Sequence, residues 1–266
     1  MQSFTSRLKE QIKASRSLLC VGLDISPEAL HAQSNQLEEC KIHAKKVVDA
    51  TKDIALAYKP NLAFFERWGS QGFQWLEELI DYIGSSHIII GDAKRGDIGN
   101  TARQYAESLY NHFQFDAVTI NPYMGRDTIL PFLENPAKGV FVLARTSNNS
   151  ATDFQNHMAA GDPVYVSVAK KCLEVNTQNN IGMVVGATAL NELELIRKLA
   201  PEIPLLIPGI GTQGGNLEAS ITIGNKSGPA IINISRAISF PGDFTIDAIR
   251  TSAELYVKRM RELIGE

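Results

Sequence analysis

Cysteine and histidine are scarce in this sequence, and their spacing matches neither a metal site nor a disulfide framework. The 266 residues include three cysteines, without a CxxC pair, and five histidines, without metal-ligand spacing. We therefore predict no metal site. An odd, small number of cysteines is typical of a reduced compartment, so we expect a cytoplasmic protein. Cys20 lies in an apolar run and is expected to be an inert core residue.

Long apolar runs and an excess of positive charge are also lacking. No apolar stretch approaches the roughly 18 residues of a membrane span, and the first residues lack the apolar core of a signal peptide. The formal net charge of −3 disfavours nucleic acid as the main partner, but it allows local basic sites for phosphate. The 44% of hydrophobic residues suffices for a sizeable core. We expect a globular protein with one large α/β domain or two small ones.

Short apolar runs alternate with longer helical patterns along the chain, which is typical of a parallel sheet with crossover helices. Strands are predicted at 18–23, 56–59, 88–91, 117–120, 139–144, 182–186, 205–208 and 230–234. Helices are predicted near 37–54, 71–83, 99–113, 125–133, 162–176, 189–199, 215–223 and 245–264, after a short amphipathic helix carrying Phe4, Leu8 and Ile12. Eight βα units in about 250 residues predict an α/β fold, a (β/α)8 TIM barrel forming one domain over 1–266. A doubly wound open sheet is the alternative, since six or seven strands would be compatible with some of these patterns.

Polar residues follow most of the predicted strands, at the end where a barrel enzyme carries its active site. They include Asp24 after the first strand, Lys59 and Asn61 after the second, Asp92 and Lys94 after the third, Asn121 after the fourth, Arg145 and Ser147 after the fifth, and Arg236 after the eighth. Each alone could be a capping or turn residue. Together they predict a polar site at the carboxyl ends of the strands.

The segment 91–101 combines charges of both signs directly after an apolar run. Residues two apart on a strand share a face, so Asp92 and Lys94 should point the same way. Asp97 is placed to cap the following helix, with Thr101 four residues later. Burying such charges is costly unless they are paired. The cluster is either a structural ion pair at the end of a core strand or a reaction centre.

A phosphate site is predicted after the last two strands. Gly209, Gly211, Gly214 and Gly215 would let the backbone approach an anion and offer peptide N–H donors. Arg236 adds a forked cationic donor, and Gln213 could donate as well. Alternatively, the glycines only form a turn and Arg236 pairs with a surface carboxylate.

The stretch 145–161 is long and polar, which is typical of a lid or binding loop. Its Ser147 and Asn148 could hydrogen-bond a heterocycle. The structural alternative is a flexible, solvated insertion.

Asp92-x-Lys94-x-x-Asp97-Ile98-x-x-Thr101 resembles the DxKxxDIxxT motif of orotidine 5′-phosphate decarboxylases. The resemblance extends to Asp24, Lys59, the segment 208–215 and Arg236, and 121–125 and 145–148 are similar to the longer bacterial subfamily. DxKxxD also occurs in related barrels that act on sugar phosphates. The segment 211–216 is short, so the phosphate-gripping loop of some relatives is expected to be reduced here.

This resemblance implies a lyase that converts orotidine 5′-monophosphate into UMP, the last step of de novo pyrimidine nucleotide synthesis, without metal or organic cofactor. It implies a homodimer that binds a small-molecule nucleotide. By this resemblance, Lys94 donates a proton to C6 and Asp92 lies beside the substrate carboxylate, while Asp97 from the neighbouring subunit completes the charge network, with Thr101 at the shared edge.

The resemblance also implies which residues hold the rest of the nucleotide. Asp24 and Lys59 bind the ribose, and Lys59 also belongs to the charge network. Ser147 contacts the pyrimidine, and the phosphate is bound by Gln213, Gly214 and Arg236.

Two alternatives belong to other functional classes. One is a Mg²⁺-dependent sugar-phosphate decarboxylase or aldolase in which Asp92 holds the metal, although Lys94 beside it counts against this. The other is a non-catalytic nucleotide-binding or regulatory barrel, in which the complete charged set would be unexpected.

Overall fold

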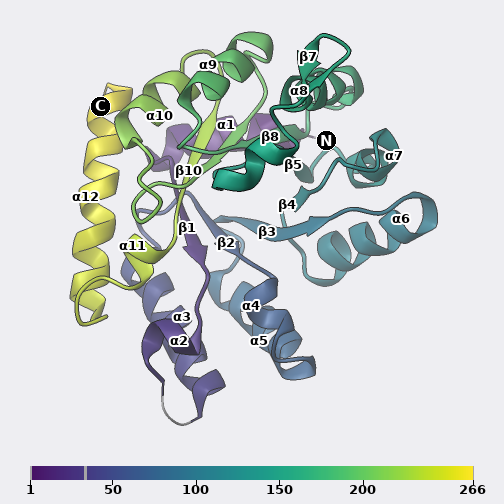
Figure 1. Ribbon diagram of the computed structural model, residues 1–266. Helices are drawn as coiled ribbons and strands as arrows, with labels where there is room; N and C mark the ends of the chain where they lie inside the picture. The colour runs from purple at the N-terminus through teal and green to yellow at the C-terminus, as the bar shows by residue number, and fades with distance from the viewer. Residues whose placement is uncertain (1, 33–34, 266) are drawn as a thin grey trace.

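Eight parallel strands close into a barrel in the computed structural model, which describes residues 2–32 and 35–265 (Figure 1). Their spatial order is β1-β10-β9-β8-β5-β4-β3-β2, with β2 returning to β1. The predicted (β/α)8 barrel is confirmed, and the doubly wound sheet is wrong. The strands are β1 (Leu19–Leu23), β2 (Ala57–Pro60), β3 (Ile88–Arg95), β4 (Ala117–Ile120), β5 (Gly139–Arg145), β8 (Ile181–Val185), β9 (Leu205–Pro208) and β10 (Ala230–Ile234).

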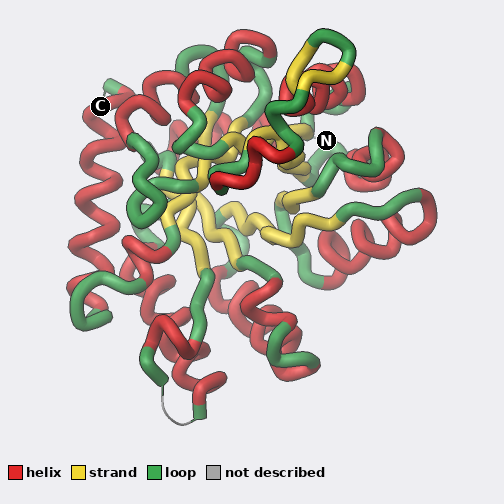
Figure 2. Tube along the Cα trace, viewed as in Figure 1, coloured by secondary structure: helices red, strands yellow, loops and turns green. Residues whose placement is uncertain are grey.

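Helices surround the barrel in the positions that the hydrophobic patterns predict (Figure 2). The predicted helix at 99–113 ends in a π turn, and the one at 125–133 ends in a 3₁₀ turn. Three four-residue helices were not predicted because one turn carries no hydrophobic period. The predicted helices are α1 (Phe4–Ser15), α3 (Gln36–Thr51), α5 (Ser70–Ile83), α6 (Gly99–Glu107), α7 (Arg126–Ile129), α8 (Val164–Val175), α9 (Leu190–Leu199), α10 (Leu217–Gly224) and α12 (Ile246–Ile264); the short ones are α2 (Pro27–Leu30), α4 (Ala63–Glu66) and α11 (Arg236–Ser239).

The barrel interior is apolar, and α1 closes its amino-terminal end. Phe4 meets the ring of Phe141 edge-on, with 5.9 Å between centroids. A Cβ atom at Gly139 would lie 2.4 Å from the Phe4 ring, so glycine there makes room for this plug. Cys20 lies in the same interior cluster, where burial raises the pKa of its thiol to about 12. Its predicted role as an inert core residue is confirmed.

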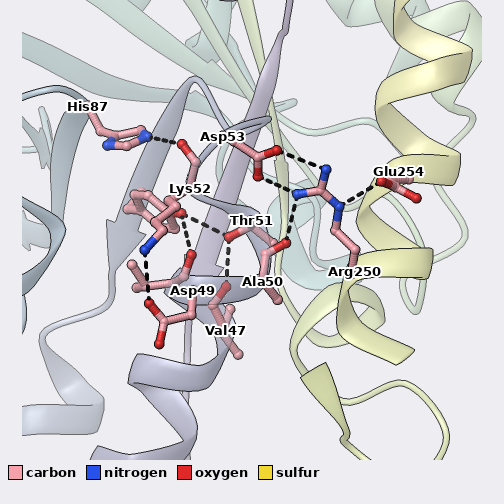
Figure 3. A network of polar contacts seen from close by, with 11 residues as sticks. Val47, Asp49, Ala50, Thr51, Lys52, Asp53, His87, Arg250 and Glu254 are labelled. Atoms are coloured by element: carbon pink, nitrogen blue, oxygen red, sulfur yellow. Dashed lines mark hydrogen bonds and ion pairs between the residues drawn. The ribbon is translucent and has the colours of Figure 1, made fainter. Parts of the chain in front are cut away.

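The last helix is joined to the third at the amino-terminal side of the barrel (Figure 3). Arg250 of α12 donates to both carboxylate oxygens of Asp53, to the carbonyl oxygen of Ala50 at 3.3 Å and to Glu254 at 2.7 Å. Hydrogen bonding to Asp53 raises the pKa of Arg250, so its charge persists. This network ties the two ends of the βα series together, away from the carboxyl ends of the strands.

The polar stretch 145–161 is folded rather than irregular throughout. It contains a short 3₁₀ helix (Asn149–Asp153) and the strand β6 (Met158–Ala159), which forms a two-stranded hairpin with β7 (Asp162–Pro163) directly after the stretch. The side-chain amide of Gln155 accepts from the Thr146 backbone amide and donates to the Thr146 hydroxyl, both at 2.8 Å. These bonds hold the base of the stretch against the end of β5.

Across the described residues, no helix is both long and apolar enough to cross a membrane.

Candidate active site

A cavity of about 540 Å³ opens at the carboxyl ends of the barrel strands. Seven of the predicted site residues line it: Asp24, Lys59, Asp92, Lys94, Ser147, Gln213 and Arg236. The remaining lining residues include Asn61, Phe64, Thr119, Leu143, Thr146, Asn148, Val184, Leu206, Thr212, Asn233 and Ser235. The prediction of a polar site at this end of the barrel is confirmed.

The carboxylate of Asp92 is held between two ammonium groups at the floor of this cavity. Lys59 Nζ lies 2.8 Å from Asp92 Oδ2, and Lys94 Nζ lies 2.6 Å from Oδ1. Thr119 donates its hydroxyl to the same Oδ1 at 2.8 Å. Asp92 and Lys59 are only 9% and 4% exposed, whereas the Lys94 side chain is 49% exposed. One lysine is therefore part of the floor, and the other can meet a ligand.

Both buried members of this network are charged. Burial favours the neutral carboxylic acid, but Lys59 and Lys94 outweigh it and hold the pKa of Asp92 well below its usual range. Burial likewise disfavours the Lys59 ammonium, yet Asp92 and Asp24 raise its pKa above the ordinary value. The cavity thus presents a fixed negative charge between two positive ones at neutral pH.

Lys94 reaches the site through an irregular backbone, contrary to the simple strand alternation predicted for it. The ladder of β3 against β4 shifts between Gly91 and Arg95, and Lys94 has a φ of 47°. Such a conformation for a long side chain costs of the order of 1 kcal/mol and occurs where surrounding contacts enforce it. Here the Lys94 backbone amide donates to Thr119 Oγ1 at 3.0 Å. Thr119 therefore holds both the backbone of Lys94 and the carboxylate that Lys94 contacts.

Asp97 and Thr101 do not line the cavity of their own chain. Asp97 is half-buried just before α6, and Thr101 is exposed in its first turn. The prediction that Asp97 caps this helix is wrong, because the N-cap residue is Ile98 and no side chain caps it. The Asp97 carboxylate instead accepts from the adjacent Ile98 amide at 2.8 Å.

The glycine-rich segment after β9 forms a tight turn. Gly209 and Gly211 have φ values of 107° and 82°, which favour glycine. The amide of Gly214 donates to Gly211 O at 2.9 Å, and that of Gly215 donates to Gly209 O at 3.0 Å. The turn itself therefore uses these two peptide N–H groups, and anion binding by this segment stays a prediction. Gly214 does not line the cavity.

Arg236 and Gln213 both line the cavity, as predicted. Arg236 is the first residue of α11, and no described residue forms an ion pair or a side-chain hydrogen bond with its guanidinium. The alternative prediction, an ion pair between Arg236 and a surface carboxylate, is therefore wrong for the described residues. Ser147 lies beside the same turn, since its Cβ would be 3.3 Å from a Cβ atom at Gly209. A cation and two polar side chains are thus available to an anion without breaking existing pairs.

Sequence reasoning missed Thr119, a polar residue of the cavity that lies inside a predicted strand. Thr119 follows Ala117 at a spacing of two in β4, and Ala117 faces the barrel interior. Strand alternation places the Thr119 side chain one layer above Ala117, so the signal was a polar residue near the carboxyl end of an inward-facing row.

Comparison with known proteins gives a consistent result over nearly the whole chain. The profile described as "Orotidine 5'-phosphate decarboxylase / HUMPS family" matches residues 17–244. An orotidine 5′-phosphate decarboxylase of Natronomonas pharaonis is 45% identical over 248 residues, covering 92% of this chain and 91% of that protein. The solved structure of Leishmania donovani OMP decarboxylase has a TM-score of 0.87 and 35% identity, covering 98% of this chain and 99% of that one. A solved Toxoplasma gondii structure reaches a TM-score of 0.91 at 35% identity, covering 98% and 96% of the two chains.

Proposed function

This chain belongs to the orotidine 5′-phosphate decarboxylase family, and we propose that Lys94, Asp92 and Lys59 carry out its reaction without a metal ion or an organic cofactor. The enzyme is a carboxy-lyase that converts orotidine 5′-monophosphate into UMP, the last step of de novo pyrimidine nucleotide synthesis. One observation carries the proposed mechanism: the Asp92 carboxylate is fixed between the two lysine ammonium groups in the barrel mouth.

The reaction breaks the bond between C6 and the carboxylate carbon and leaves an electron pair on C6. The substrate carboxylate lies beside Asp92, and two carboxylates about 4 Å apart repel by roughly 4 kcal/mol at an effective dielectric constant near 20. Relief of that repulsion is worth about a thousandfold in rate. A carbanion without an electron sink needs more stabilisation, which a preorganised ammonium group supplies.

Lys94 provides this group, because it is the exposed lysine of the pair. As CO₂ leaves, its ammonium stabilises the charge on C6 and then transfers a proton there, becoming a neutral amine that solvent reprotonates. Lys59 stays on the far side of Asp92 and keeps that carboxylate ionised.

The rest of the nucleotide follows the shape of the cavity. Arg236 and Gln213 bind the phosphate at the α11 side. The pyrimidine lies over the apolar floor formed by Leu143, Val184 and Leu206, with Ser147 at its edge. Asp24 and Lys59 bind the ribose. Binding energy from the phosphate fixes the ring and raises turnover as well as affinity.

The active unit is a homodimer in which Asp97 and Thr101 complete the partner's site. The half-buried Asp97 and the exposed Thr101 lie in a segment that carries a set of large exposed apolar side chains, which is expected of a surface covered by a second subunit. Around α6 and α7 these are Ile98, Tyr105, Tyr123, Met124 and Leu130, exposed by 47%, 36%, 89%, 50% and 43%. An isolated subunit would lack one carboxylate of the charge network and would be inactive.

A cytoplasmic location accompanies this proposal. All three cysteines are buried and unpaired, as expected of a protein from a reducing compartment. Fractionation of the source cells tests it.

The deciding assay follows loss of pyrimidine absorbance with orotidine 5′-monophosphate in the presence of excess chelator. Turnover that the chelator does not change supports the proposed mechanism. Activity that appears only after Mg²⁺ is added points to the metal-dependent barrel enzymes, and binding of UMP without turnover points to a non-catalytic nucleotide-binding barrel.

A further inference from the structure

The position of Arg236 depends on the short helix that carries it. Among the described residues, none forms an ion pair or a side-chain hydrogen bond with its guanidinium, so the backbone of α11 largely sets where this cation lies. This helix is a single turn, in which Ser239 N donates to Ser235 O at 2.9 Å and Phe240 N donates to Arg236 O at 3.0 Å. A helix of one turn is not stable alone. The place of α11 is therefore set by bonds from neighbouring elements.

Three side-chain hydrogen bonds among the described residues tie α11 to the elements around it. Ser252 of α12 donates to the carbonyl oxygen of Ala237 at 2.8 Å, and Ser239 donates to that of Gly22 in β1 at 3.3 Å. The shortest comes from α3, where His43 Nε2 lies 2.6 Å from the carbonyl oxygen of Ser239. Because a carbonyl oxygen only accepts, the His43 Nε2 atom carries the proton and donates.

The His43 ring is itself firmly held. Only 3% of the residue is exposed. Its ring stacks on Phe240 at 5.2 Å between centroids and meets Phe244 edge-on at 6.0 Å. Lys46, one turn further along α3, donates to the Phe244 carbonyl oxygen at 3.2 Å. Burial lowers the pKa of His43, so the ring is neutral at pH 7. Thus α3 holds both ends of the segment that runs from the end of α11 to Phe244.

The same kind of bond elsewhere in the chain shows why its location matters. His87 Nε2 lies 2.6 Å from the carbonyl oxygen of Lys52, and the His87 ring meets Tyr58 edge-on at 5.2 Å. His87 directly precedes β3, at the amino-terminal side of the barrel, so its bond supports the fold away from the cavity. The His43 bond ends on α11 instead, three residues or about 4.5 Å along the helix from Arg236.

We propose that His43 is a positioning residue for the phosphate site, which acts through α11 by holding Arg236 where the nucleotide phosphate binds. This inference rests on the proposed function, since it takes from it the role of Arg236 as the phosphate-binding cation. A cation on a fixed helix loses less freedom when the phosphate binds, and a displaced one meets the phosphate poorly. Loss of the His43 bond therefore weakens the phosphate contact and leaves the contacts of the base and the sugar in place.

A double-mutant cycle read with two ligands tests the inference. The affinities of UMP and of uridine, which lacks the phosphate, are measured for the wild type, His43→Leu, Arg236→Ala and the double variant. We expect His43→Leu to weaken UMP about tenfold and uridine less than about twofold. In the Arg236→Ala background, the same substitution should change UMP affinity less than about twofold, because the cation that His43 positions is gone. His43→Gln, which keeps an N–H donor, should restore most of the UMP affinity.

The matched control is His87→Leu, which removes a bond of the same length to a backbone carbonyl. It should lower the melting temperature and leave the ratio of UMP to uridine affinity unchanged. His43→Phe keeps an aromatic ring beside Phe240 without the N–H donor. It should show the same loss of UMP affinity as His43→Leu, and it replaces that variant in the cycle if His43→Leu does not fold.

An equal loss for UMP and uridine, an undiminished loss in the Arg236→Ala background, or no loss at all would overturn the proposal. So would a His43→Gln variant that binds UMP as weakly as His43→Leu does. The cycle also separates this inference from the proposed function. If Arg236→Ala lowers the ratio of UMP to uridine affinity and His43→Leu does not, only the role of His43 is lost. If Arg236→Ala keeps the wild-type ratio, the proposed phosphate site is lost together with it.

Discussion

Lys94 Nζ lies 2.6 Å from Asp92 Oδ1, although the Lys94 backbone departs from the strand that carries both residues. The left-handed φ of 47° turns the side chain back over the carboxylate. Lys59 already forms an ion pair with the buried Asp92 carboxylate, so the Lys94 ammonium is not needed to offset the free-energy cost of burying that carboxylate. The Lys94 ammonium is therefore available to the charge that develops on the substrate.

Removing Lys59 should damage the fold as well as the reaction. In Lys59→Met the buried Asp92 carboxylate loses the more buried of its two lysine partners. Breaking a buried ion pair lowers the free energy of unfolding by about 3 kcal/mol or more. We expect a melting temperature lower by about 6 °C or more, together with loss of activity. The double variant Lys59→Met/Asp92→Asn should recover stability without activity. If the single variant is as stable as the wild type, the pair does not carry the burial cost described.

The pH dependence of the unfolding free energy should reflect the titration of Asp92 and Lys59. The pKa of Asp92 is lowered, so its contribution is present above the unfolded value of about 4 and is lost as pH falls through the folded one. The pKa of Lys59 is raised, so its contribution is present below about pH 10 and is lost as pH rises through the folded value. We expect the difference in unfolding free energy between wild type and Asp92→Asn to be constant from about pH 5 to 9. Urea titrations across this range measure it, and a steep change near neutrality would contradict the charge assignment.

Mixing two inactive variants tests whether the site is shared between subunits. In a heterodimer of Lys94→Ala and Asp97→Ala chains, one site keeps both residues and the other lacks both. After the subunits re-equilibrate, we expect about a quarter of the wild-type activity. The control mixture, Lys94→Ala with Arg236→Ala, should remain inactive because each chain supplies both of those residues to its own site. Activity that stays absent in the first mixture would contradict the shared site.

Much of the barrel could be predicted because each strand is a short apolar run between helices with their own period. The convergence of Asp24, Lys59, Asp92 and Arg236 followed from the rule that strand ends meet at one edge of a barrel. This rule needs only the position of a residue along its strand, so it predicts which residues converge without knowledge of their side-chain contacts.

Three other features could not be read from the residue pattern, and the first depends on a contact between distant segments. The bulge that turns Lys94 toward Asp92 is fixed by Thr119, 25 residues further along the chain. The amides of Gly214 and Gly215 are used within their turn, which a glycine pattern alone does not reveal. Asp97 fails as a helix cap because the helix begins one residue later than capping would require. The roles of Asp97 and Thr101 at a dimer interface remain predictions.

The most direct test of the central claim is turnover and UMP binding by Lys94→Ala. We expect its turnover to fall by at least about a thousandfold, because the group that stabilises and protonates C6 is gone. UMP binding should stay measurable, since Arg236 and the apolar floor are unchanged. Lys170→Ala, which removes an exposed lysine paired with Asp162, is the control and should keep wild-type activity. Substantial turnover by Lys94→Ala would contradict the account.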